Sequence, residues 1–426
     1  MYKVLVIAYY FPPMGLSGVQ RTLKFTKYML KNNWEPTVIT AGDVGYFAHD
    51  NSLLKEAEEN KIRIIRVEGK EVNSKLAKYG TISMPGEFLR KTLSRISKAI
   101  YIPDNKKSWA KKAYLKAKEL LQEEKFDAIF VTIPPYSSFV MAARLKREFD
   151  VPLFVDYRDL WYKNHFSFYP TPYHKYRHKK LEYNALKATE KVIAVNRKIK
   201  ESILVRYNFL NFDDVVIIPH GYDTDDFKNI DPIPRNDKKL WLTYSGIFYE
   251  NITPKYLLNA FKKLIIERPD IAQAIELHFV GYLGKSNKKL ILELGLTDYI
   301  RDHGYLDHNE ALKKVISSDV LWCMLGRSVS DDTVTPGKLF EYFGTRKPIL
   351  GCLPEGVSKA ALKDYQASFI TKPDDVEEIK NTLMKIYELF KENKLPVANE
   401  EFVQKHDRAF LTEQLVKLFQ FYLSEI

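Results

Sequence analysis

Short apolar runs alternate with longer amphipathic stretches along the first half of the chain. The first run, residues 4–8, is continuous (Val-Leu-Val-Ile-Ala), which is typical of a parallel strand that is buried on both faces. Similar runs follow, separated by polar stretches long enough for helices, at residues 37–40, 62–67, 128–131, 153–155 and 192–195. Strands that alternate with helices form parallel, doubly wound sheets, so this half predicts one α/β domain.

The same alternation begins again after an irregular segment. Residues 219–236 contain Pro232, Pro234 and several aspartates without clear periodicity, so we predict a linker there. Further strand-like runs follow at residues 240–244, 275–280, 320–325, 349–350 and 368–370. The fold class predicted is therefore α/β with two doubly wound, Rossmann-like domains, 1–220 and 221–405. Residues 406–426 carry apolar positions at helical spacing and predict a C-terminal amphipathic helix.

The composition agrees with two hydrophobic cores and indicates the cellular compartment. A chain of 426 residues that is 45% hydrophobic suits two domains of ordinary size. Its two cysteines, Cys323 and Cys352, form no CxxC pair, which predicts neither a disulfide framework nor a zinc site and fits a reducing cytoplasm. The N-terminal apolar run is too short for a signal peptide, and nowhere do 18 apolar residues run together.

The positive net charge indicates anionic partners but does not identify which kind. A net charge of +12 favours nucleotide phosphates, lipid pyrophosphates, a membrane surface or nucleic acid. No helix-turn-helix, zinc finger or RNA-recognition motif is apparent, so we expect no nucleic-acid partner.

Residues 335–344 (Thr-Pro-Gly-Lys-Leu-Phe-Glu-Tyr-Phe-Gly) predict a loop that enters a short helix. The first N–H groups of a helix have no internal partner and attract anions, and Lys338 adds a cation there. Glu341 lies three residues later on the same face, where its carboxylate can accept hydrogen bonds from sugar hydroxyls. Together these groups fit a nucleotide sugar, although this segment alone equally fits an ordinary helix with a solvated Lys/Glu pair.

Two segments of the first half also carry candidate chemistry. The loop Gly15-Leu16-Ser17-Gly18 lacks both the GxGxxG spacing of a dinucleotide site and the GxSxG of a hydrolase, but its glycines permit close approach of a diphosphate. Asp156, Arg158 and Asp159 follow a buried strand, at the end where α/β sheets bind ligands. The alternative is a structural ion pair between Arg158 and Asp159.

Five blocks in matching order resemble glycosyltransferase family 4: residues 9–21, 134–135, 156–161, 219–223 and 335–344. The resemblance implies a GT-B fold, with two domains facing across a cleft and the last helix crossing back to the first domain. It also implies a retaining, metal-independent, hexosyltransferase-type enzyme that needs no cofactor. The donor would be a nucleotide-diphosphate sugar, and the acceptor a glycan or lipid-linked hydroxyl, as in bacterial surface polysaccharide synthesis.

The resemblance also implies site residues. Catalytic roles fall to Arg158, Asp159 and Lys255; substrate-binding roles fall to Gly15, Gly18, Asp156, Gly246, Thr335, Gly337, Lys338 and Glu341; no metal ligand is expected. The chain departs from the family in three places. Thr333 stands where the family often has a first glutamate, with Asp331 and Asp332 beside it; Ile252 stands where an arginine is common; and Arg158 is the best match to a histidine. These departures keep open a nonenzymatic, GT-B-like binding or scaffold subunit.

Residues 88–101 predict a basic amphipathic helix. Its apolar positions recur at helical spacing (Leu89, Leu93, Ile96, Ile100), and the basic ones are Arg90, Lys91, Arg95 and Lys98. A second basic tract lies at residues 175–180. We therefore expect peripheral contact with an anionic membrane, at the inner face of the plasma membrane. The alternative is a helix that turns its apolar stripe to the core and its basic face to water.

Overall fold

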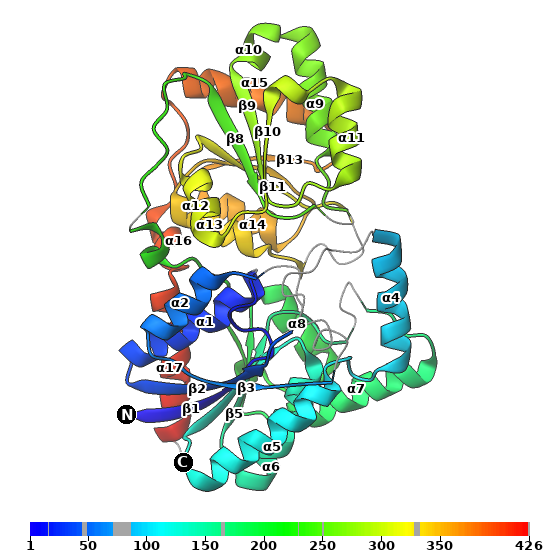
Figure 1. Cartoon of the computed structure of the whole chain (residues 1–426), viewed down its shortest axis with the longest axis vertical. Coiled ribbons are helices and arrows are strands. Elements are labelled where there is room, and N and C mark those ends of the chain that lie inside the picture. Colours follow the sequence, from blue (N-terminus) through cyan, green and yellow to red (C-terminus); the bar gives the residue numbers. More distant parts are fainter. Residues whose placement is uncertain are drawn as a thin grey trace. The chain divides into compact units, whose positions relative to one another are not determined.

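The computed structural model describes residues 1–15, 17–44, 49–70, 87–162, 167–228, 230–248, 251–327 and 333–424, of which residues 17 and 87–91 are described by their backbone only. The chain divides into two compact domains (Figure 1). The N-terminal domain comprises Met1–His220 together with Arg408–Ile426, and the C-terminal domain comprises Gly221–Asp407.

The N-terminal domain is built on a parallel sheet of seven strands in the order β3-β2-β1-β4-β5-β6-β7. The strands are β1 (Tyr2–Ile7), β2 (Trp34–Ala41), β3 (Arg63–Val67), β4 (Ala128–Ile133), β5 (Leu153–Tyr157), β6 (Lys191–Ala194) and β7 (Val215–Ile217). The helices between them are α1 (Ser17–Lys31), α2 (Asn51–Glu59), α4 (Glu87–Ile100), α5 (Lys107–Glu123), α6 (Tyr136–Phe149), α7 (Pro172–Leu186) and α8 (Arg197–Arg206), with a short 3-10 turn at Phe212–Asp214.

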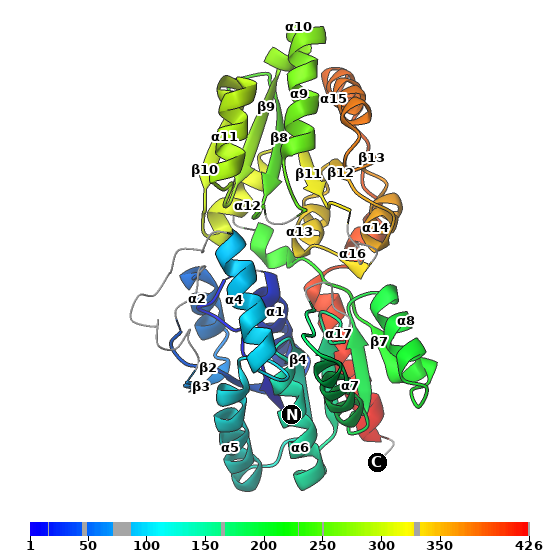
Figure 2. The same cartoon turned by 90° about the vertical axis from the view of Figure 1, so that its right-hand side faces the viewer.

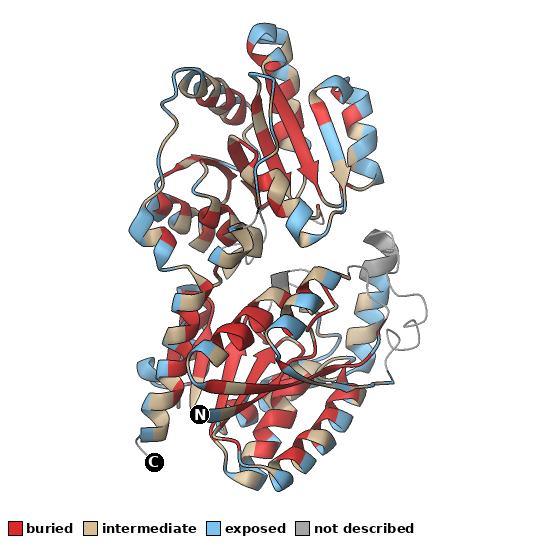
Figure 3. Cartoon of the chain, turned by 60° about the vertical axis from the view of Figure 1, so that its left-hand side comes forward, coloured by how far each residue is buried: buried red, intermediate tan, exposed pale blue. Residues whose placement is uncertain are grey.

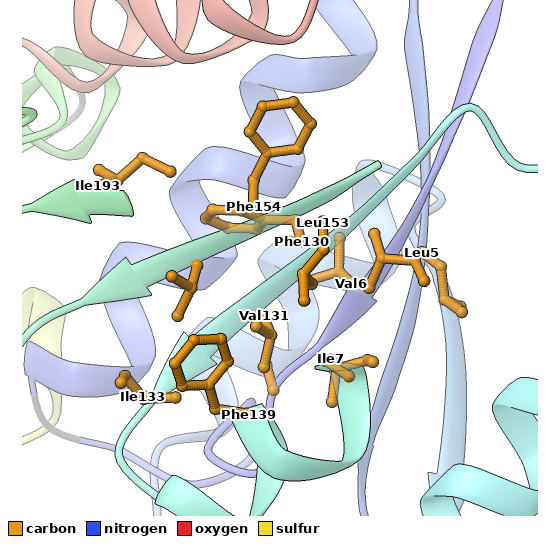
Figure 4. Packing of buried hydrophobic residues seen from close by; sticks show 14 of the residues in the cluster. Leu5, Val6, Ile7, Phe130, Val131, Ile133, Phe139, Leu153, Phe154 and Ile193 are labelled. Carbon is orange, nitrogen blue, oxygen red and sulfur yellow. The ribbon is translucent and has the colours of Figure 1, made fainter. Parts of the chain in front are cut away.

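Helices cover both faces of this sheet. Phe154 of β5 packs on Phe419 of the last helix, α17 (Arg408–Ser424), with their ring centroids 4.4 Å apart. Tyr157 lies three residues along the same strand and meets Phe139 of α6 instead. Because successive strand residues point to opposite faces, α17 and α6 lie on opposite sides of the sheet. Figure 4 shows the apolar side chains of β1, β4 and β5 that fill this core.

The C-terminal domain repeats the plan with six parallel strands in the order β10-β9-β8-β11-β12-β13. They are β8 (Leu240–Ser245), β9 (Ile275–Val280), β10 (Ile300–Gly304), β11 (Val320–Met324), β12 (Ile349–Cys352) and β13 (Ser368–Thr371). Its helices are α9 (Lys255–Glu267), α10 (Pro269–Gln273), α11 (Lys285–Leu294), α12 (His308–Ile316), α13 (Gly337–Thr345), α14 (Val357–Tyr365), α15 (Val376–Lys391) and α16 (Glu400–Gln404), with 3-10 turns at Thr224–Phe227 and Thr297–Tyr299.

Strand β11 shows why this sheet has an apolar layer on each side. Trp322 and Met324 belong to the cluster that α9 and α15 cover, whereas Leu321 and Cys323 belong to the cluster around α13 and α14. The strand is therefore apolar at every position, as parallel strands between two helical layers are. Red, buried strands inside partly exposed helices are visible in both domains in Figure 3.

The predicted fold class, an α/β pair of doubly wound sheets, is confirmed. Two edge strands were not predicted. The sequence of β10 (Ile-Arg-Asp-His-Gly) is mostly polar because Arg301 and Asp302 are exposed, and β7 has only three residues. Both cysteines are buried and free, as the sequence indicated. Among the helices that the structure describes, none combines the length and the apolar character needed to cross a bilayer.

Candidate functional site

Each sheet has one place where the strand order reverses. In the N-terminal domain it lies between β1 and β4, and in the C-terminal domain between β8 and β11. Loops leaving the carboxyl ends of two such strands diverge to opposite sides and leave a crevice, which is where open α/β sheets bind ligands. Most of the predicted site residues follow these four strands or their neighbours.

In the C-terminal domain, the reversal point brings Gly246 and Lys338 together. Gly246 follows β8 with a φ of +135°, and a Cβ atom at this position would lie 2.5 Å from the Lys338 Nζ. The backbone conformation therefore favours glycine, and the end of the Lys338 side chain fills the space that a Cβ atom would need. Lys338 comes from α13, beyond β11, and its Nζ lies 3.5 Å from the centroid of the Tyr244 ring. The hydroxyl of Tyr342 accepts a hydrogen bond from the Ser245 amide (2.8 Å), which ties α13 to the end of β8.

The Lys338 ammonium group is held without a carboxylate at ion-pair distance among the described residues. Burial lowers the pKa of Lys338 to about 7, while Cys323 and Glu341 act in the opposite direction. The face of the Tyr244 ring carries partial negative charge and supports a cation, though less than a carboxylate would. An anionic ligand at this position would supply the missing charge.

The start of α13 adds a second feature that suits an anion. Pro336 is the N-cap residue, and no side chain caps the helix, so the amides of Gly337 and Lys338 belong to the first turn without a capping oxygen from the described residues. Thr335 comes immediately before and is partly exposed. The predicted residues Thr335, Gly337 and Lys338 thus lie at a helix start beside Gly246.

Glu341 contacts a residue that the sequence did not suggest. His308, the first residue of α12, has its Nε2 atom 3.2 Å from the Glu341 carboxylate. The Glu341 side chain keeps 23% of its surface exposed, whereas His308 keeps 10%. The alternative for this segment, a Lys338/Glu341 pair, is not formed at ion-pair distance among the described residues, although the charge of Glu341 acts to raise the pKa of Lys338. His308 could have been noticed only by predicting β10, because it then stands just beyond the carboxyl end of a strand.

Lys255 is the first residue of α9 and is exposed. Its loop adjoins the end of β11, since the Thr253 amide lies 3.4 Å from the Met324 Sδ atom and the Asn251 side chain donates to the Arg327 carbonyl (3.2 Å). The structure does not bring Lys255 into contact with Lys338 or Gly246. Ile252, at the position of the family arginine, packs against the apolar clusters. Thr333 is partly exposed, while Asp331 and Asp332 lie outside the described residues.

In the N-terminal domain, Arg158 connects the loops at the reversal point. Its guanidinium group donates to the carbonyl oxygens of Gly18, Ile133 (3.3 Å) and Pro134 (2.6 Å). A Cβ atom on Gly18 would lie 2.7 Å from the Arg158 Nη1, so a larger residue there would displace the guanidinium group. Gly15 is buried nearby in the sequence, at the end of the loop after β1.

Asp156 and Arg21 form a buried ion pair. Arg21 Nη2 lies 2.7 Å from one carboxylate oxygen and Nε lies 3.0 Å from the other, and both side chains are almost fully buried. Thr132 also donates to this carboxylate (3.3 Å). With these partners, Asp156 ties α1 to β5, and its role in substrate binding stays a prediction. Asp159 is partly exposed and, in the part of the chain that the structure describes, forms no ion pair with Arg158.

His220 follows β7 and was not among the predicted site residues, although it belongs to one of the five blocks. Burial and the nearby positive charges of Arg21, Arg408 and Arg158 hold the pKa of His220 well below its usual range. Its imidazole is therefore neutral at neutral pH and can accept as well as donate a hydrogen bond.

Comparison with solved structures identifies the fold as GT-B. A glycosyltransferase from Rickettsia africae superimposes with a TM-score of 0.63 at 15% identity, covering 98% of each chain. Anabaena HepE in complex with UDP gives 0.62 at 12% identity, covering 99% of this chain and all of that one. WaaG, a glycosyltransferase involved in lipopolysaccharide biosynthesis, gives 0.61 at 14% identity, covering 98% and 99%.

Residues 18–226 match the family model described as Glycosyltransferase Family 4. Together with the GT-B fold of the solved structures, this match confirms the resemblance to glycosyltransferase family 4. No curated protein matches the sequence.

Proposed function

We propose that the protein transfers a sugar from a nucleotide-diphosphate sugar to an acceptor hydroxyl and retains the anomeric configuration. The observation that carries this proposal is the Lys338 ammonium group, which lies over the Tyr244 ring beside Gly246 and next to the uncapped start of α13. A cation without a carboxylate partner and a helix N-terminus both attract anions, and here they lie at the same reversal point. A diphosphate is the ligand that best fits this combination.

In this proposal, the C-terminal domain holds the donor. As the bond between the sugar and the diphosphate breaks, negative charge grows on the leaving group, and Lys338 and the Gly337 amide stabilise it because they are already in place. A diphosphate would raise the pKa of Lys338 above 7 and keep it charged during the reaction. Glu341 accepts hydrogen bonds from the ribose hydroxyls, and His308 orients its carboxylate. Lys255 offers a second cation. No step needs a metal ion.

The N-terminal domain is assigned to the acceptor. Asp159 is the partly exposed carboxylate after β5, and the neighbouring Arg158 holds the start of α1 at Gly18 and the loop after β4 at Pro134. We expect a glycan or lipid-linked hydroxyl as acceptor, in the synthesis of a bacterial surface polysaccharide. The two free, buried cysteines fit the reducing cytoplasm, where we place the protein.

The second candidate function is a nonenzymatic GT-B-like binding or scaffold subunit. It is favoured by Ile252, which packs into the apolar clusters where the family often has a phosphate-binding arginine, and by Thr333 in place of the first glutamate. Both proposals predict that nucleotide sugars bind, but only the enzyme releases nucleoside diphosphate.

The test combines binding and turnover. A thermal-shift screen of nucleotide sugars, beginning with UDP-sugars because Anabaena HepE was solved with UDP, identifies the donor through its stabilisation of the folded state. Release of nucleoside diphosphate is then measured with a panel of acceptors, and the anomeric configuration of the product is read by NMR. Stabilisation by a donor without any turnover would favour the scaffold, and no stabilisation by any nucleotide sugar would reject the donor site.

A further inference from the structure

The α4 helix exposes its apolar side. Leu93, Ile96 and Ile100 recur at helical spacing and are 52%, 51% and 66% exposed. Among the α4 side chains that the structure describes, residues 92–100, the partly buried ones are instead Ser94, Ser97 and Lys98. A helix of a globular domain normally turns its apolar stripe to the core, so this helix has the opposite orientation. The expected alternative, a core-facing stripe with a solvated basic face, does not describe these residues.

Helix α7 lies next to α4 and exposes a similar mixture. His174 of α7 has its Nε2 atom 3.1 Å from the Ala99 carbonyl oxygen, and Arg95 of α4 lies 5.7 Å from the Phe168 ring centroid, just before α7. Figures 1 and 2 show α4 at the outside of the N-terminal domain. Tyr173 and Tyr176 are 61% and 57% exposed, on the side of α7 away from the buried His178 and Glu182.

The acidic residues of the two helices are Glu87, the first residue of α4, and Glu182, which is buried in α7; apart from these two, every charged residue of the helices is basic. Residues 88–103 and 160–181 contain no aspartate or glutamate. Among the described residues, Arg95, Lys175, Lys179 and Lys180 are exposed. We call the exposed side chains of residues 93–100 and 173–180 the α4–α7 surface.

We propose that the α4–α7 surface docks on an anionic lipid membrane. Aliphatic side chains enter the acyl boundary, tyrosines favour the interface between lipid and water, and lysines attract anionic headgroups. Two copies of this chain joined symmetrically through the surface would place its basic residues against one another, which disfavours a homodimer. A nucleic acid would suit the lysines and tyrosines but leave the Leu93, Ile96 and Ile100 stripe exposed. The inference goes beyond sugar transfer and does not depend on it.

Two triple variants test the surface. Leu93→Ser/Ile96→Ser/Ile100→Ser removes the apolar stripe, and Lys175→Gln/Lys179→Gln/Lys180→Gln removes three charges. The matched controls change exposed residues elsewhere: Val205→Ser/Ile266→Ser/Leu292→Ser, and Lys111→Gln/Lys112→Gln/Lys125→Gln. All of these side chains are exposed, so the melting temperature should stay close to that of the wild type.

The measurement is sedimentation of the full chain with vesicles of phosphatidylcholine alone or of equimolar phosphatidylcholine and phosphatidylglycerol, without any donor. We expect binding to the anionic vesicles only, and its release by high salt. Each lysine near the surface strengthens binding about fivefold, so the lysine variant should bind about a hundredfold more weakly. The serine variant should lose about tenfold or more, and both controls should bind as the wild type does.

Three results would overturn the proposal. The first is equal binding to both kinds of vesicle, or none. The second is unchanged vesicle binding by both surface variants. The third is evidence that another partner binds this surface. This would be a dimer in sedimentation velocity that only the serine variant dissociates, or an affinity for a DNA duplex equal to the affinity for the anionic vesicles.

Discussion

At the reversal point of the N-terminal sheet, the buried cation Arg21 lies 2.7 Å from the carboxylate of Asp156. At the equivalent place in the C-terminal sheet, the cation Lys338 lies over the Tyr244 ring and has no carboxylate within ion-pair distance among the described residues. A buried cation that is already paired with a carboxylate gains little free energy by binding an anionic ligand. A cation without such a partner is stabilised when an anion binds. The two domains share a topology but use their cations differently.

From this difference we assign a structural role to Arg21 and a binding role to Lys338. Arg21 and Asp156 hold α1 against β5, and Arg21 also donates to the carbonyl oxygens of Ile218 (2.9 Å) and Pro219 (2.6 Å). These residues are therefore expected to govern stability. Burial lowers the pKa of Lys338, so its charged form is disfavoured in this environment, and Lys338 is expected to govern binding.

The largest expected effect comes from breaking the buried ion pair between Arg21 and Asp156. Arg21→Met leaves the Asp156 carboxylate buried without its partner, so the free energy of unfolding of the N-terminal domain should fall by about 3–5 kcal/mol. Urea denaturation measures this loss. The double variant Arg21→Met/Asp156→Leu should recover part of it, because no buried charge remains. A loss below about 1 kcal/mol for Arg21→Met would contradict the structural role of the pair.

The next effect concerns donor binding in the C-terminal domain. Glu341→Gln keeps the shape of the side chain and removes its charge, which weakens its hydrogen bonds to the ribose. A hydrogen bond to a charged group contributes roughly 1.5–3 kcal/mol, so donor affinity or turnover should fall about tenfold or more. Kinetics and melting temperature are measured together.

The matched control is Glu310→Gln, which changes an exposed carboxylate at the start of α12, the helix that carries His308. It should leave donor use unchanged. A folded Glu341→Gln protein with wild-type affinity and turnover would remove the donor pocket from residues 335–341.

The elements of this fold could be predicted because the signal is local. Continuous apolar runs such as residues 4–8 and 128–131 mark strands between two helical layers, and each needs only its own sequence to be recognised. Strand β10 could not be predicted in the same way. It pairs with β9 on one side only, so its side chains Arg301 and Asp302 remain in water and carry no apolar pattern.

The sequence was enough to propose the residues of the candidate site, but not to predict which of them pair. Sequence motifs pointed to Asp156 and Lys338, because charged residues at strand ends and helix starts often meet ligands. They could not show that Asp156 pairs with Arg21, 135 residues away, or that Glu341 lies beside His308. Whether a charge is compensated depends on such distant partners, and this decides between a structural and a binding role.

A smaller effect is expected from the two glycines that make room for a cation. Gly246→Ala would force a residue with a Cβ atom to adopt a φ of +135° and would displace the Lys338 Nζ. It should cost about 1–3 kcal/mol of stability and weaken donor binding. Gly18 lies in helix α1, where alanine is favoured, so Gly18→Ala requires only that the Arg158 guanidinium group shift. It should change stability by less than about 1 kcal/mol. Thermal unfolding and donor titration of both variants test this contrast, and equal losses would contradict it.

The smallest effect is the contribution of Lys338 to the pH dependence of stability. Its pKa is about 7 in the folded protein and about 10.4 in an unfolded chain. Between these values the unfolded state binds one more proton than the folded state, so the stability of the C-terminal domain rises with pH. Below about pH 7 both states are protonated, and the full penalty of the buried charge remains.

Lys338→Met should remove this contribution, and at pH 7 its melting temperature should equal or exceed that of the wild type. Because the side chain of Lys338 is partly exposed, we expect a gain of no more than about 2–4 °C, as about 1 kcal/mol produces in a domain of 150–250 residues. Lys363→Met, an exposed change in the same domain, is the control and should follow the wild type at each pH. The same Lys338→Met protein should bind the donor more weakly. A stability difference between wild type and Lys338→Met that stays constant from about pH 7 to about pH 10 would show that Lys338 is not held as an uncompensated cation.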